Sequence, residues 1–531
     1  MSIRKAFAKY SPGHGARDQP AMNHEKISMP DHETACPEFD LLVIGGGING
    51  VGVARDAAGR GLKVCLCEKD DLAQHTSSAS TKLIHGGLRY LEQYDFRLVH
   101  HALREREVLL RNAPHIIHPI RFVLPHNESL RPIWMIRLGL FLYDHLGGRR
   151  QLPGSRRVML EQHVAGRALK EVYRTGFEYS DCWVQDARLV VLNAMDAAAR
   201  GAEVLTHTRC VALSRGPTHW KATLRNERDG SSRTLTERAV VNAAGPWVEQ
   251  VLESGVTTEH VRGIRFVKGS HIVVPRLFEH DYAYIFQHRD GRVLFAIPFE
   301  GEFTLLGTTD IELDTLPEKN RITPEEVAYI CQAVSEYFMR PVQPSDVVWN
   351  FSGVRPLYDD AASDASRVTR DYNLHLDCDQ APILSIYGGK ITTYRRLAEE
   401  VLDLLSGCLD IRGTPWTETS QLPGGDLPDA DFDRFLFGCA TAYPWLSPAQ
   451  LRTYAGLYGT RIHQLLAGCD AEEELGLHFG GGLFEREVRY LITQEYAESA
   501  EDIVWRRTKR GLRMSSEEIA RLDRWLLERR E

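Results

Sequence analysis

The sequence contains no long apolar run. Among its 531 residues, no uninterrupted stretch of about 18 apolar side chains occurs, so we predict no transmembrane helix. No secretory signal is recognisable, and the first 38 residues are polar, with glycine, proline, histidine and mixed charge. We expect residues 1–38 to form a flexible extension.

The sequence also has no metal-binding cysteine pattern and no excess of positive charge. None of its ten cysteines forms a C-x-x-C pair with metal spacing, and we predict no metal site. Cys65 and Cys67 alternate on an expected buried strand, where packing explains them better than reactivity does. We therefore expect a reducing, cytosolic compartment. The formal net charge of −8 argues against a general nucleic-acid partner.

A glycine-rich turn follows the first apolar run. Residues 39–44 are largely apolar and lead into Gly45, Gly47 and Gly50, which have the G-x-G-x-x-G spacing. In a dinucleotide-binding turn, such glycines permit a tight turn, close approach of the backbone to a pyrophosphate, and close packing of helix on strand. Backbone N–H groups at the start of the next helix would face the anion.

The residues that follow complete a strand–helix–strand unit. Residues 51–60 carry small apolar side chains suited to a helix on a sheet, and Gly61 predicts its end. Residues 63–67 predict a second strand, which ends at Glu68, near the distance expected for an acid that binds a ribose. The alternative is a glycine-rich turn in another kind of α/β unit.

Two further stretches could approach a flat ligand. Residues 71–82 are small and polar, and they lead to His85, a pair of glycines, Arg89 and Tyr90. A simple loop is the alternative here. Residues 239–247 again predict a strand, then small residues, then a helix start, which gives a second place for close backbone approach.

Residues 131–143 form an apolar segment of moderate length, flanked by arginines. Periodicity slightly favours a buried helix of a substrate domain. The alternative is a helix in a bilayer interface, with aromatic side chains at headgroup level and arginines on phosphates.

The rest of the chain divides into a strand-rich part and a helical part. Residues 264–370 predict an antiparallel sheet that carries a substrate pocket. A strand over 382–387, a glycine turn and a helix to about Leu405 follow, with Thr392 or Thr393 as the helix cap. Residues 421–428 predict a linker, beyond which the pattern is helical.

Several longer strings are far more specific than the first glycine motif. They are IGGGINGVGVARDAAGRG, TSSASTKLIHGGLRYLE, GFEYSDCWVQDARL, KGSHIVVP, LLGTTD, SGVRPLYDD, YGGKITTYRRLAE and WRRTKRGL. On these strings the chain resembles the FAD-dependent, quinone-linked glycerol-3-phosphate dehydrogenases of the aerobic respiratory type. The resemblance covers nearly everything from about residue 38 to the C-terminus.

The resemblance implies an α/β fold with three parts. A Rossmann-like FAD-binding domain (about 39–95, 155–260 and 350–410) is interleaved within 39–420 with a β-rich substrate domain (about 96–154 and 261–349). A C-terminal all-α domain follows over 421–531.

The resemblance also implies an activity. It is the oxidation of sn-glycerol 3-phosphate to dihydroxyacetone phosphate by hydride transfer to flavin N5, with electrons passed through FAD to a membrane quinone. Peripheral attachment to the inner face of a cytoplasmic membrane is implied too, which favours the interfacial interpretation of residues 131–143, and so is a homodimer. The alternatives are a glycerol-3-phosphate oxidase that uses O₂ and a non-catalytic, flavin-bound membrane scaffold.

The same resemblance assigns residues to the site. Those expected around the substrate and the flavin ring are Arg89, Tyr90, Arg355, Lys390 and Thr393. Those expected to bind FAD are Gly45, Gly47, Ile48, Asn49, Gly50, Glu68, Thr76, Ser77, Ser80, Lys82, Leu83, His85, Gly86, Gly87, Ala244, Gly245, Gly389, Lys390, Ile391 and Thr392. Ala244 stands where relatives often have threonine, and we expect this lost hydroxyl to tune the site rather than abolish activity.

The chemistry limits which side chains can act. Arg89 and Arg355 suit the substrate phosphate, because guanidinium groups bind phosphate oxygens in fixed geometry. Lys390 could stabilise negative charge on reduced flavin, aided by the helix start behind it. His271 and His85 are alternative general bases for the C2 hydroxyl proton. Arg355 could replace a dedicated base by lowering the pKa of that hydroxyl.

Overall fold

The computed structural model describes residues 37–126, 131–148, 152–253, 263–288, 291–358 and 371–529. Residues 1–36 of the expected extension lie outside the described residues, and all described residues belong to the compact unit Pro37–Glu531. No helix in these ranges is both long enough and apolar enough to cross a membrane.

The first sheet is mainly parallel and contains the glycine-rich turn. Its strand order is β17-β18-β10-β1-β2-β7, with β9 paired antiparallel to β10 and β8 paired antiparallel to β9. The strands are β1 (Phe39–Ile44), β2 (Val64–Cys67), β7 (Glu203–Leu205), β8 (Thr208–Arg215), β9 (Trp220–Asn226), β10 (Ser232–Asn242), β17 (Asn373–Asp377) and β18 (Ile383–Tyr387). The predicted strand–helix–strand unit is confirmed as β1, α1 (Ile48–Gly59) and β2.

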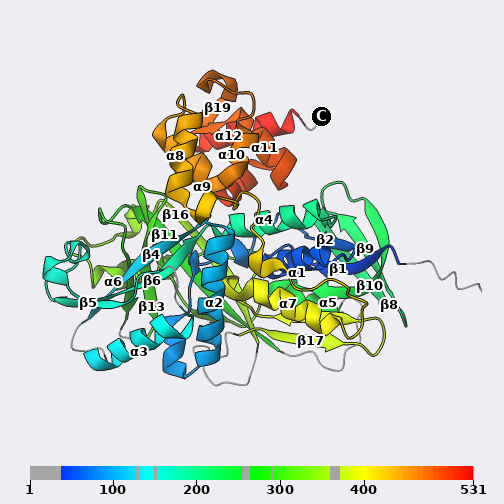
Figure 1. Ribbon diagram of the computed structural model, residues 1–531, viewed down its shortest axis with the longest axis horizontal. Helices are drawn as coiled ribbons and strands as arrows, with labels where there is room; N and C mark the ends of the chain where they lie inside the picture. Colours follow the sequence, from blue (N-terminus) through cyan, green and yellow to red (C-terminus); the bar gives the residue numbers. More distant parts are fainter. Residues whose placement is uncertain are drawn as a thin grey trace, which may run out of the picture. The chain divides into compact units, whose positions relative to one another are not determined.

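Alternating side chains place β1 between two cores. Leu41 and Val43 pack into a core shared with α1, α4 (Asp186–Ala199) and α7 (Tyr394–Leu405), while Leu42 and Ile44 pack into the core of the β8–β9–β10 face. Helix α1 lies between α4 and α7 (Figure 1). Burial of both strand faces, at about 1.5–3 kcal/mol for each large aliphatic side chain, therefore fixes the position of the turn after β1.

The second sheet confirms the predicted strand-rich region. Its order is β15-β11-β14-β13-β12-β4-β6-β3, with β16 paired to β11 and β5 to β6, and its pairings are antiparallel except β12 with β4. The strands are β3 (Leu83–Ile84), β4 (Ile117–His126), β5 (Arg156–Met159), β6 (Thr175–Val184), β11 (Ile264–Pro275), β12 (Ala283–Gln287), β13 (Val293–Phe299), β14 (Phe303–Gly307), β15 (Ile311–Leu313) and β16 (Trp349–Tyr358). Helices α2 (Phe96–Asn112), α3 (Ile133–Leu146) and α6 (Pro324–Ser335) accompany it, and α5 (Val248–Glu253) follows β10.

The two sheets do not follow the expected residue ranges at every strand. Strands β3, β5, β6 and most of β16 lie in ranges expected for the FAD-binding domain, yet they pair within the second sheet. An alternating pattern identifies a strand but not the sheet it joins. The remaining domain boundaries stay predictions.

Helix α3 packs one face on a core and exposes apolar side chains on the other. Only Leu140 and Tyr143 are buried, whereas Trp134, Leu138 and Phe141 are 64%, 52% and 56% exposed. The buried-helix interpretation of residues 131–143 therefore holds for one face of the helix and is wrong for the other. The exposed residues recur at i, i+4 and i+7, which places them on one face of the helix.

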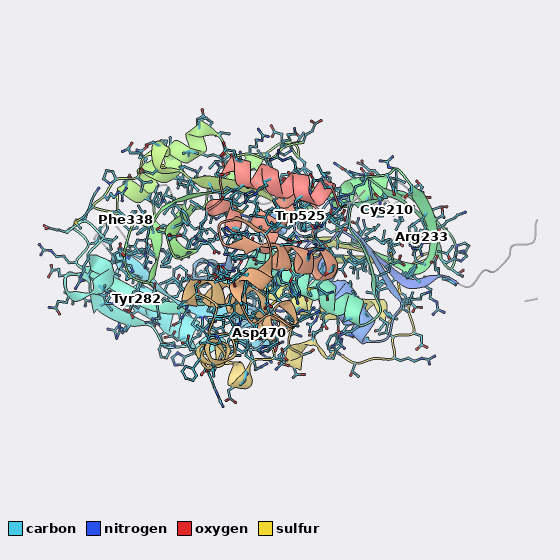
Figure 2. All side chains as sticks on the ribbon, turned by 90° about the horizontal axis from the view of Figure 1, so that it is seen from above. Cys210, Arg233, Tyr282, Phe338, Asp470 and Trp525 are labelled. Carbon is cyan, nitrogen blue, oxygen red and sulfur yellow. A yellow bond between two sulfur atoms is a disulfide. The ribbon has the colours of Figure 1, made fainter. Side chains whose placement is uncertain are left out.

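The C-terminal part has its own core and is mainly helical. Its helices are α8 (Phe432–Ala442), α9 (Pro448–Tyr458), α10 (Ile462–Leu465), α11 (Glu485–Glu495) and α12 (Ser516–Leu527), with a π-helical turn at Asp502–Arg507. Figure 2 labels Trp525 in α12 and Cys210 in β8 of the first sheet. A small hairpin, β19 (His478–Gly480) with β20 (Leu483–Phe484), interrupts the helical pattern expected to the end.

The cysteines differ in part from the expectation. Cys65 and Cys67 are buried thiols, as predicted. Cys378 and Cys408 form a disulfide, which the expectation of a reducing compartment does not anticipate.

Glu237 in β10 makes stability depend on pH. It is fully buried with no hydrogen bond to its carboxylate oxygens among the described residues, and burial, followed by the charge of Glu38, raises its pKa to about 8. The folded protein therefore keeps a proton that the unfolded chain releases, so the free energy of unfolding falls as pH rises from about 4.5 to about 8. We expect the free energy of unfolding of the wild type to fall by about 2 kcal/mol or more over this window, and that of Glu237→Gln to fall much less.

Thermal unfolding at a series of pH values measures this difference. The exposed Glu279→Gln serves as the control and should keep the wild-type dependence. Parallel pH profiles for the wild type and Glu237→Gln would contradict the assignment.

Candidate functional site

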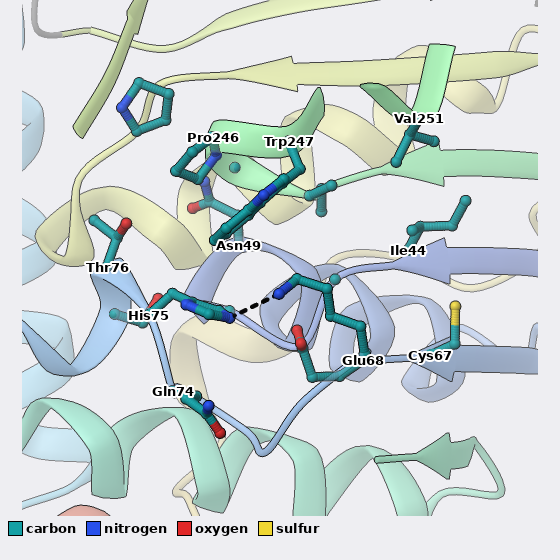
Figure 3. Close-up of a pocket in the computed structure, with 18 of the residues that line it drawn as sticks. Ile44, Asn49, Cys67, Glu68, Gln74, His75, Thr76, Pro246, Trp247 and Val251 are labelled. Atoms are coloured by element: carbon teal, nitrogen blue, oxygen red, sulfur yellow. Dashed lines mark hydrogen bonds between the residues drawn. The ribbon is translucent and has the colours of Figure 1, made fainter. Parts of the chain in front are cut away.

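A cavity of about 360 Å³ lies where β1, β2 and β10 end (Figure 3). Predicted FAD-contact residues that line it are Gly45, Gly47, Ile48, Asn49, Glu68, Thr76, Ser77, Ala244, Gly245 and Gly389. They come from five separate segments, so the fold brings together residues that the sequence places up to 344 positions apart. Parallel strands of an α/β sheet bind ligands at this edge.

The glycine turn is built for close backbone approach. Gly45 has φ +113°, a region that favours glycine, and a Cβ on Gly50 would lie 1.9 Å from the Gly45 carbonyl oxygen. Gly47 caps the start of α1 and lines the cavity. The start of this twelve-residue helix therefore offers N–H groups and a positive dipole end to a phosphate.

Glu68 is fixed at the end of β2. Its carboxylate accepts hydrogen bonds from the Gly46 N–H at 2.7 Å and the Asp70 N–H at 2.9 Å, while burial raises its pKa. A carboxylate has about four acceptor positions, so capacity remains for ribose hydroxyl groups.

Asn49 joins the glycine turn to the Gly388–Gly389 turn. Its amide Nδ2 donates to the Gly388 carbonyl oxygen at 3.1 Å, and its buried Oδ1 has no hydrogen-bond partner among the described residues. A Cβ on Gly389 would lie 2.7 Å from this Nδ2. The cavity thus contains a fixed acceptor, a carboxylate and a helix N-terminus, which together fit a dinucleotide such as FAD.

An aromatic and charged wall of the cavity lies partly in stretches 71–82 and 239–247, which were expected to approach a flat ligand, although its side chains were not assigned to the site. His75 lies 4.5 Å from Trp247 between ring centroids, and the Lys69 ammonium lies 4.3 Å from the Trp247 ring (Figure 3). Asp70 accepts a hydrogen bond from His75 at 2.8 Å, and this bond is the main reason why its pKa lies well below the usual range. Further lining residues not predicted are Gln74, Thr208, Arg209, Cys210, Val211, Gln250, Val251 and Pro356. Of these residues only Pro356 lies in a quoted string, SGVRPLYDD.

Several predicted FAD contacts do not line this cavity. Lys82 is buried, and its ammonium donates to both carboxylate oxygens of Asp186 and to the Ser78 carbonyl oxygen at 2.8–3.0 Å. Three acceptors use all three donors of an ammonium group, so the expected contact of Lys82 with FAD is not supported. The Ser80 hydroxyl also donates to Asp186, at 2.8 Å.

Apart from Gly50 in α1, the other residues outside the cavity wall lie in or around β3 and the turn before α7. Leu83 is buried in β3, and the Gly86 N–H donates to the Tyr143 hydroxyl at 2.8 Å. Gly50 lies beneath the turn, where it gives room to Gly45. The other predicted FAD contacts that do not line the cavity are His85, Gly87, Lys390, Ile391 and Thr392.

A second cluster centres on Arg355 in β16. Its guanidinium donates to Asp310 at 2.6 Å and to the Thr308 hydroxyl at 3.3 Å, while a Cβ on Gly269 would lie 2.3 Å from its Nη2. Gly269 therefore leaves the space that the guanidinium occupies. Asp310 and Thr308 belong to the quoted string LLGTTD, which could have indicated them.

His271 lies in a narrow slot on the same sheet face. Its ring stacks on Phe351 at 4.9 Å, a Cβ on Gly307 would lie 2.3 Å from its Cδ2, and its Nε2 is 3.0 Å from the Thr81 hydroxyl. Burial, then the charges of Lys82 and Arg355, lowers its pKa well below the usual value. The imidazole is therefore neutral near pH 7, and its buried Nδ1 has no partner among the described residues.

A third group surrounds Lys390. Its ammonium lies 3.8 Å from the Tyr90 ring, and the His85 N–H donates to the Thr392 hydroxyl at 3.2 Å. Thr393 is buried and occupies the predicted N-cap position of α7, but its side chain makes no capping hydrogen bond. Arg89 lies in the turn Leu88–Gln93, and its side chain is outside the described residues.

Strand β16 connects the Arg355 cluster to the cavity. The Thr76 hydroxyl donates to the Val354 carbonyl oxygen at 2.7 Å, and Pro356 lines the cavity. Arg355 thus follows directly in the chain from a residue bonded to the cavity wall. A ligand in the cavity and a small anion at Arg355 would be neighbours.

The C-terminal domain reaches the cofactor cavity through a buried carboxylate. Asp71 accepts two hydrogen bonds from Arg507 at 2.7 Å and one from Arg506 at 2.6 Å. Its own N–H donates to Gln74, which lines the cavity. The string WRRTKRGL therefore helps to hold the wall at residues 74–77.

Comparison with protein families agrees with this geometry. Residues 40–395 match a family model described as FAD dependent oxidoreductase, and residues 415–524 match one described as the C-terminal domain of alpha-glycerophosphate oxidase.

Individual proteins are similar over most of the chain. It is 51% identical to a D-erythritol 1-phosphate dehydrogenase of Brucella abortus (92% of this chain, 97% of that one) and 51% identical to a glycerol-3-phosphate dehydrogenase of Pseudomonas aeruginosa (92% and 95%). The solved structure of a glycerol-3-phosphate dehydrogenase from Bacillus halodurans complexed with FAD superposes with a TM-score of 0.74 at 28% identity, covering 92% of this chain and 90% of that one.

Proposed function

Because the chain belongs to the FAD-dependent oxidoreductase family that includes the glycerol-3-phosphate dehydrogenases, we propose that it oxidises sn-glycerol 3-phosphate to dihydroxyacetone phosphate. The observation that carries the proposal is Arg355, a forked cation on the same sheet face as a neutral histidine and one residue from the cofactor cavity wall. Phosphate needs such a cation, and alcohol oxidation needs a proton acceptor.

The residues divide the work between binding and proton transfer. FAD, when bound in the cavity, supplies the two-electron acceptor. Arg355, held by Asp310, binds and orients the anionic substrate, with Arg89 as its predicted partner. With the proton of His271 on Nε2 toward Thr81, its Nδ1 accepts the proton of the C2 hydroxyl. Lys390 adds positive charge beside Gly389 of the cavity wall.

A second substrate has a specific observation in its favour. The Brucella abortus relative, named as a D-erythritol 1-phosphate dehydrogenase, is as similar to this chain as the Pseudomonas aeruginosa enzyme is. Both substrates carry a phosphate on a polyol, so Arg355 and His271 suit either.

Anaerobic reduction of the bound flavin tests both substrates. We expect sn-glycerol 3-phosphate to abolish the visible flavin absorbance, with D-erythritol 1-phosphate as the rival and glycerol and glycine as controls. Bleaching by D-erythritol 1-phosphate alone would replace the proposed substrate. If neither compound bleached the flavin, a non-catalytic flavoprotein would be the better interpretation.

We further propose that electrons pass to a membrane quinone. The oxidase alternative stays open until reoxidation is measured. Rapid reoxidation by a quinone analogue with little peroxide supports the dehydrogenase, whereas stoichiometric peroxide in air without quinone supports the oxidase.

We also propose peripheral attachment to the inner face of a cytoplasmic membrane through α3. Its exposed stripe of Trp134, Leu138 and Phe141 lies on a helix that also exposes Arg137. The stripe has the composition of an interfacial helix, and Tyr143 ties α3 to the Gly86 segment and to Asp181.

Replacing the stripe should release the protein from membranes. Each buried apolar side chain contributes about 1.5–3 kcal/mol, so Trp134→Ser/Leu138→Ser/Phe141→Ser should weaken partition to phosphatidylethanolamine–phosphatidylglycerol vesicles by about 100-fold or more. Co-sedimentation measures this, with Phe437→Ser as the control because Phe437 is 76% exposed in α8. Equal loss in the control would argue against α3.

A further inference from the structure

A column of aromatic rings runs from the C-terminal domain to His271. Trp505 stacks on Trp349 with ring centroids 4.7 Å apart and planes 8° apart. Trp349 contacts Phe351 at 5.0 Å, and Phe351 stacks on His271 at 4.9 Å. The column joins the turn Asp502–Arg507 to β16 and β11.

Each end of the column is fixed by a different part of the chain. A Cβ on Gly511 would lie 2.5 Å from the Trp505 ring, and the Trp505 carbonyl oxygen accepts a hydrogen bond from Lys509. In the middle, the Lys82 ammonium lies 4.6 Å from the Phe351 ring. At the inner end, His271 has Phe351 on one side, Gly307 on the other and Thr81 at its edge.

We propose that Trp505 is a positioning residue for His271, and that the C-terminal domain thereby sets the geometry of proton removal. The proposal rests on the proposed function, in which His271 is the proton acceptor. Phe351 covers one face of the imidazole, and Trp349 and Trp505 keep Phe351 in place. Loss of the Trp505 ring leaves Trp349, which is only half-buried, without its outer support.

The charges around His271 explain why its placement matters. Lys82, paired with Asp186, and Arg355, paired with Asp310, both disfavour a protonated imidazole. Lys509 and Glu300 interact electrostatically with Lys82 and with each other, so they belong to the charges around His271. The slot must therefore exclude water to keep the ring neutral, and a looser column would let its pKa return toward the ordinary value.

The test compares Trp505→Ala and Trp505→Phe with Trp525→Ala in the intact holoenzyme. Trp525, labelled in Figure 2, is a buried tryptophan of α12. It contacts Phe479 in the C-terminal core, so its loss weakens that domain without touching the column. We expect Trp505→Ala to slow substrate-driven flavin reduction by about 10- to 100-fold with KM changed less than about threefold. Trp505→Phe should stay within about threefold of the wild type, because it keeps a stacked ring.

A second readout does not depend on turnover. Histidine NMR of the holoenzyme without substrate follows the His271 signal, identified by its absence in His271→Gln. We expect this signal to titrate at higher pH in Trp505→Ala than in the wild type, and to be unchanged in Trp525→Ala. If Trp505→Ala does not fold, Trp505→Leu takes its place.

The outcomes separate the two proposals. A His271 titration unchanged by loss of the Trp505 ring overturns the positioning role, and so does an equal rate loss in Trp525→Ala. If the wild-type flavin is not reduced by either polyol phosphate, the proposed function fails, while the titration still decides whether Trp505 fixes His271.

Discussion

Arg355→Ala should reduce kcat/KM for the polyol phosphate by about 100-fold or more. The substitution removes the forked cation of the site and leaves Asp310 without its 2.6 Å partner. Truncating one member of such a charged pair costs about 2–5 kcal/mol, and each 1.4 kcal/mol is a factor of ten in rate. Arg355→Lys should be intermediate, because lysine keeps the charge but loses the fork. Rapid-mixing measurement of flavin reduction over a range of substrate concentrations gives the rate constant per substrate concentration for each variant.

The control for this experiment is Arg276→Ala. Arg276 also follows a strand of the second sheet, but its guanidinium donates to the carbonyl oxygens of Phe278, Glu279 and Gly301 rather than to the Asp310 cluster. It should retain kcat/KM within about threefold. An Arg355→Ala enzyme that keeps near-wild-type kcat/KM would remove Arg355 from the proposed mechanism.

Gly50→Ala should cost most of the affinity for FAD. Its Cβ would lie 1.9 Å from the Gly45 carbonyl oxygen, so the turn that faces the cavity must move. Gly45 cannot yield easily, because the backbone of Ala243 and Ala244 packs against it: a Cβ on Gly45 would lie 2.5 Å from the Ala243 carbonyl oxygen. Overpacking of this kind costs about 1–3 kcal/mol, which predicts a Kd for FAD raised by about 10- to 100-fold.

Flavin released per mole of purified protein, with titration of the apoprotein by FAD, measures this change. Gly438→Ala in α8 is the matched control, because no atom lies within 4 Å of its Cβ position. It should keep the wild-type flavin content. Full flavin content in Gly50→Ala would show that the turn adapts.

The sequence was most informative where the signal is local. The glycines after β1 and the acid at the end of β2 lie within one strand–helix–strand unit, so spacing alone places them around one cavity. The same logic does not reveal the partner of the Lys82 ammonium, because Asp186 is 104 residues away in the chain. A polar side chain inside a motif can bind the protein itself rather than the ligand.

The second cluster could be predicted only in part. Arg355 and His271 were singled out separately, but their neighbours depend on the register of β11 with β16, which pairs His271 with Phe351. For helix α3 the sequence could not decide the environment, because its apolar composition suits either a core or a membrane surface. Which one applies depends on the elements that contact it.

The bond between Asp71 and Arg507 spans 436 residues and therefore has a consequence for biosynthesis. At about 5–20 residues per second, roughly 20–90 s separate the synthesis of these two residues. Until Arg507 emerges, burying the Asp71 carboxylate would leave a charge without its partner, at a cost of about 3–5 kcal/mol. The cavity wall at residues 74–77 is thus completed only after nearly the whole chain has left the ribosome. A polypeptide that stops short of residue 506 lacks both arginines that hold Asp71 beside this wall, and we therefore expect it to retain the cofactor less well than the full-length chain.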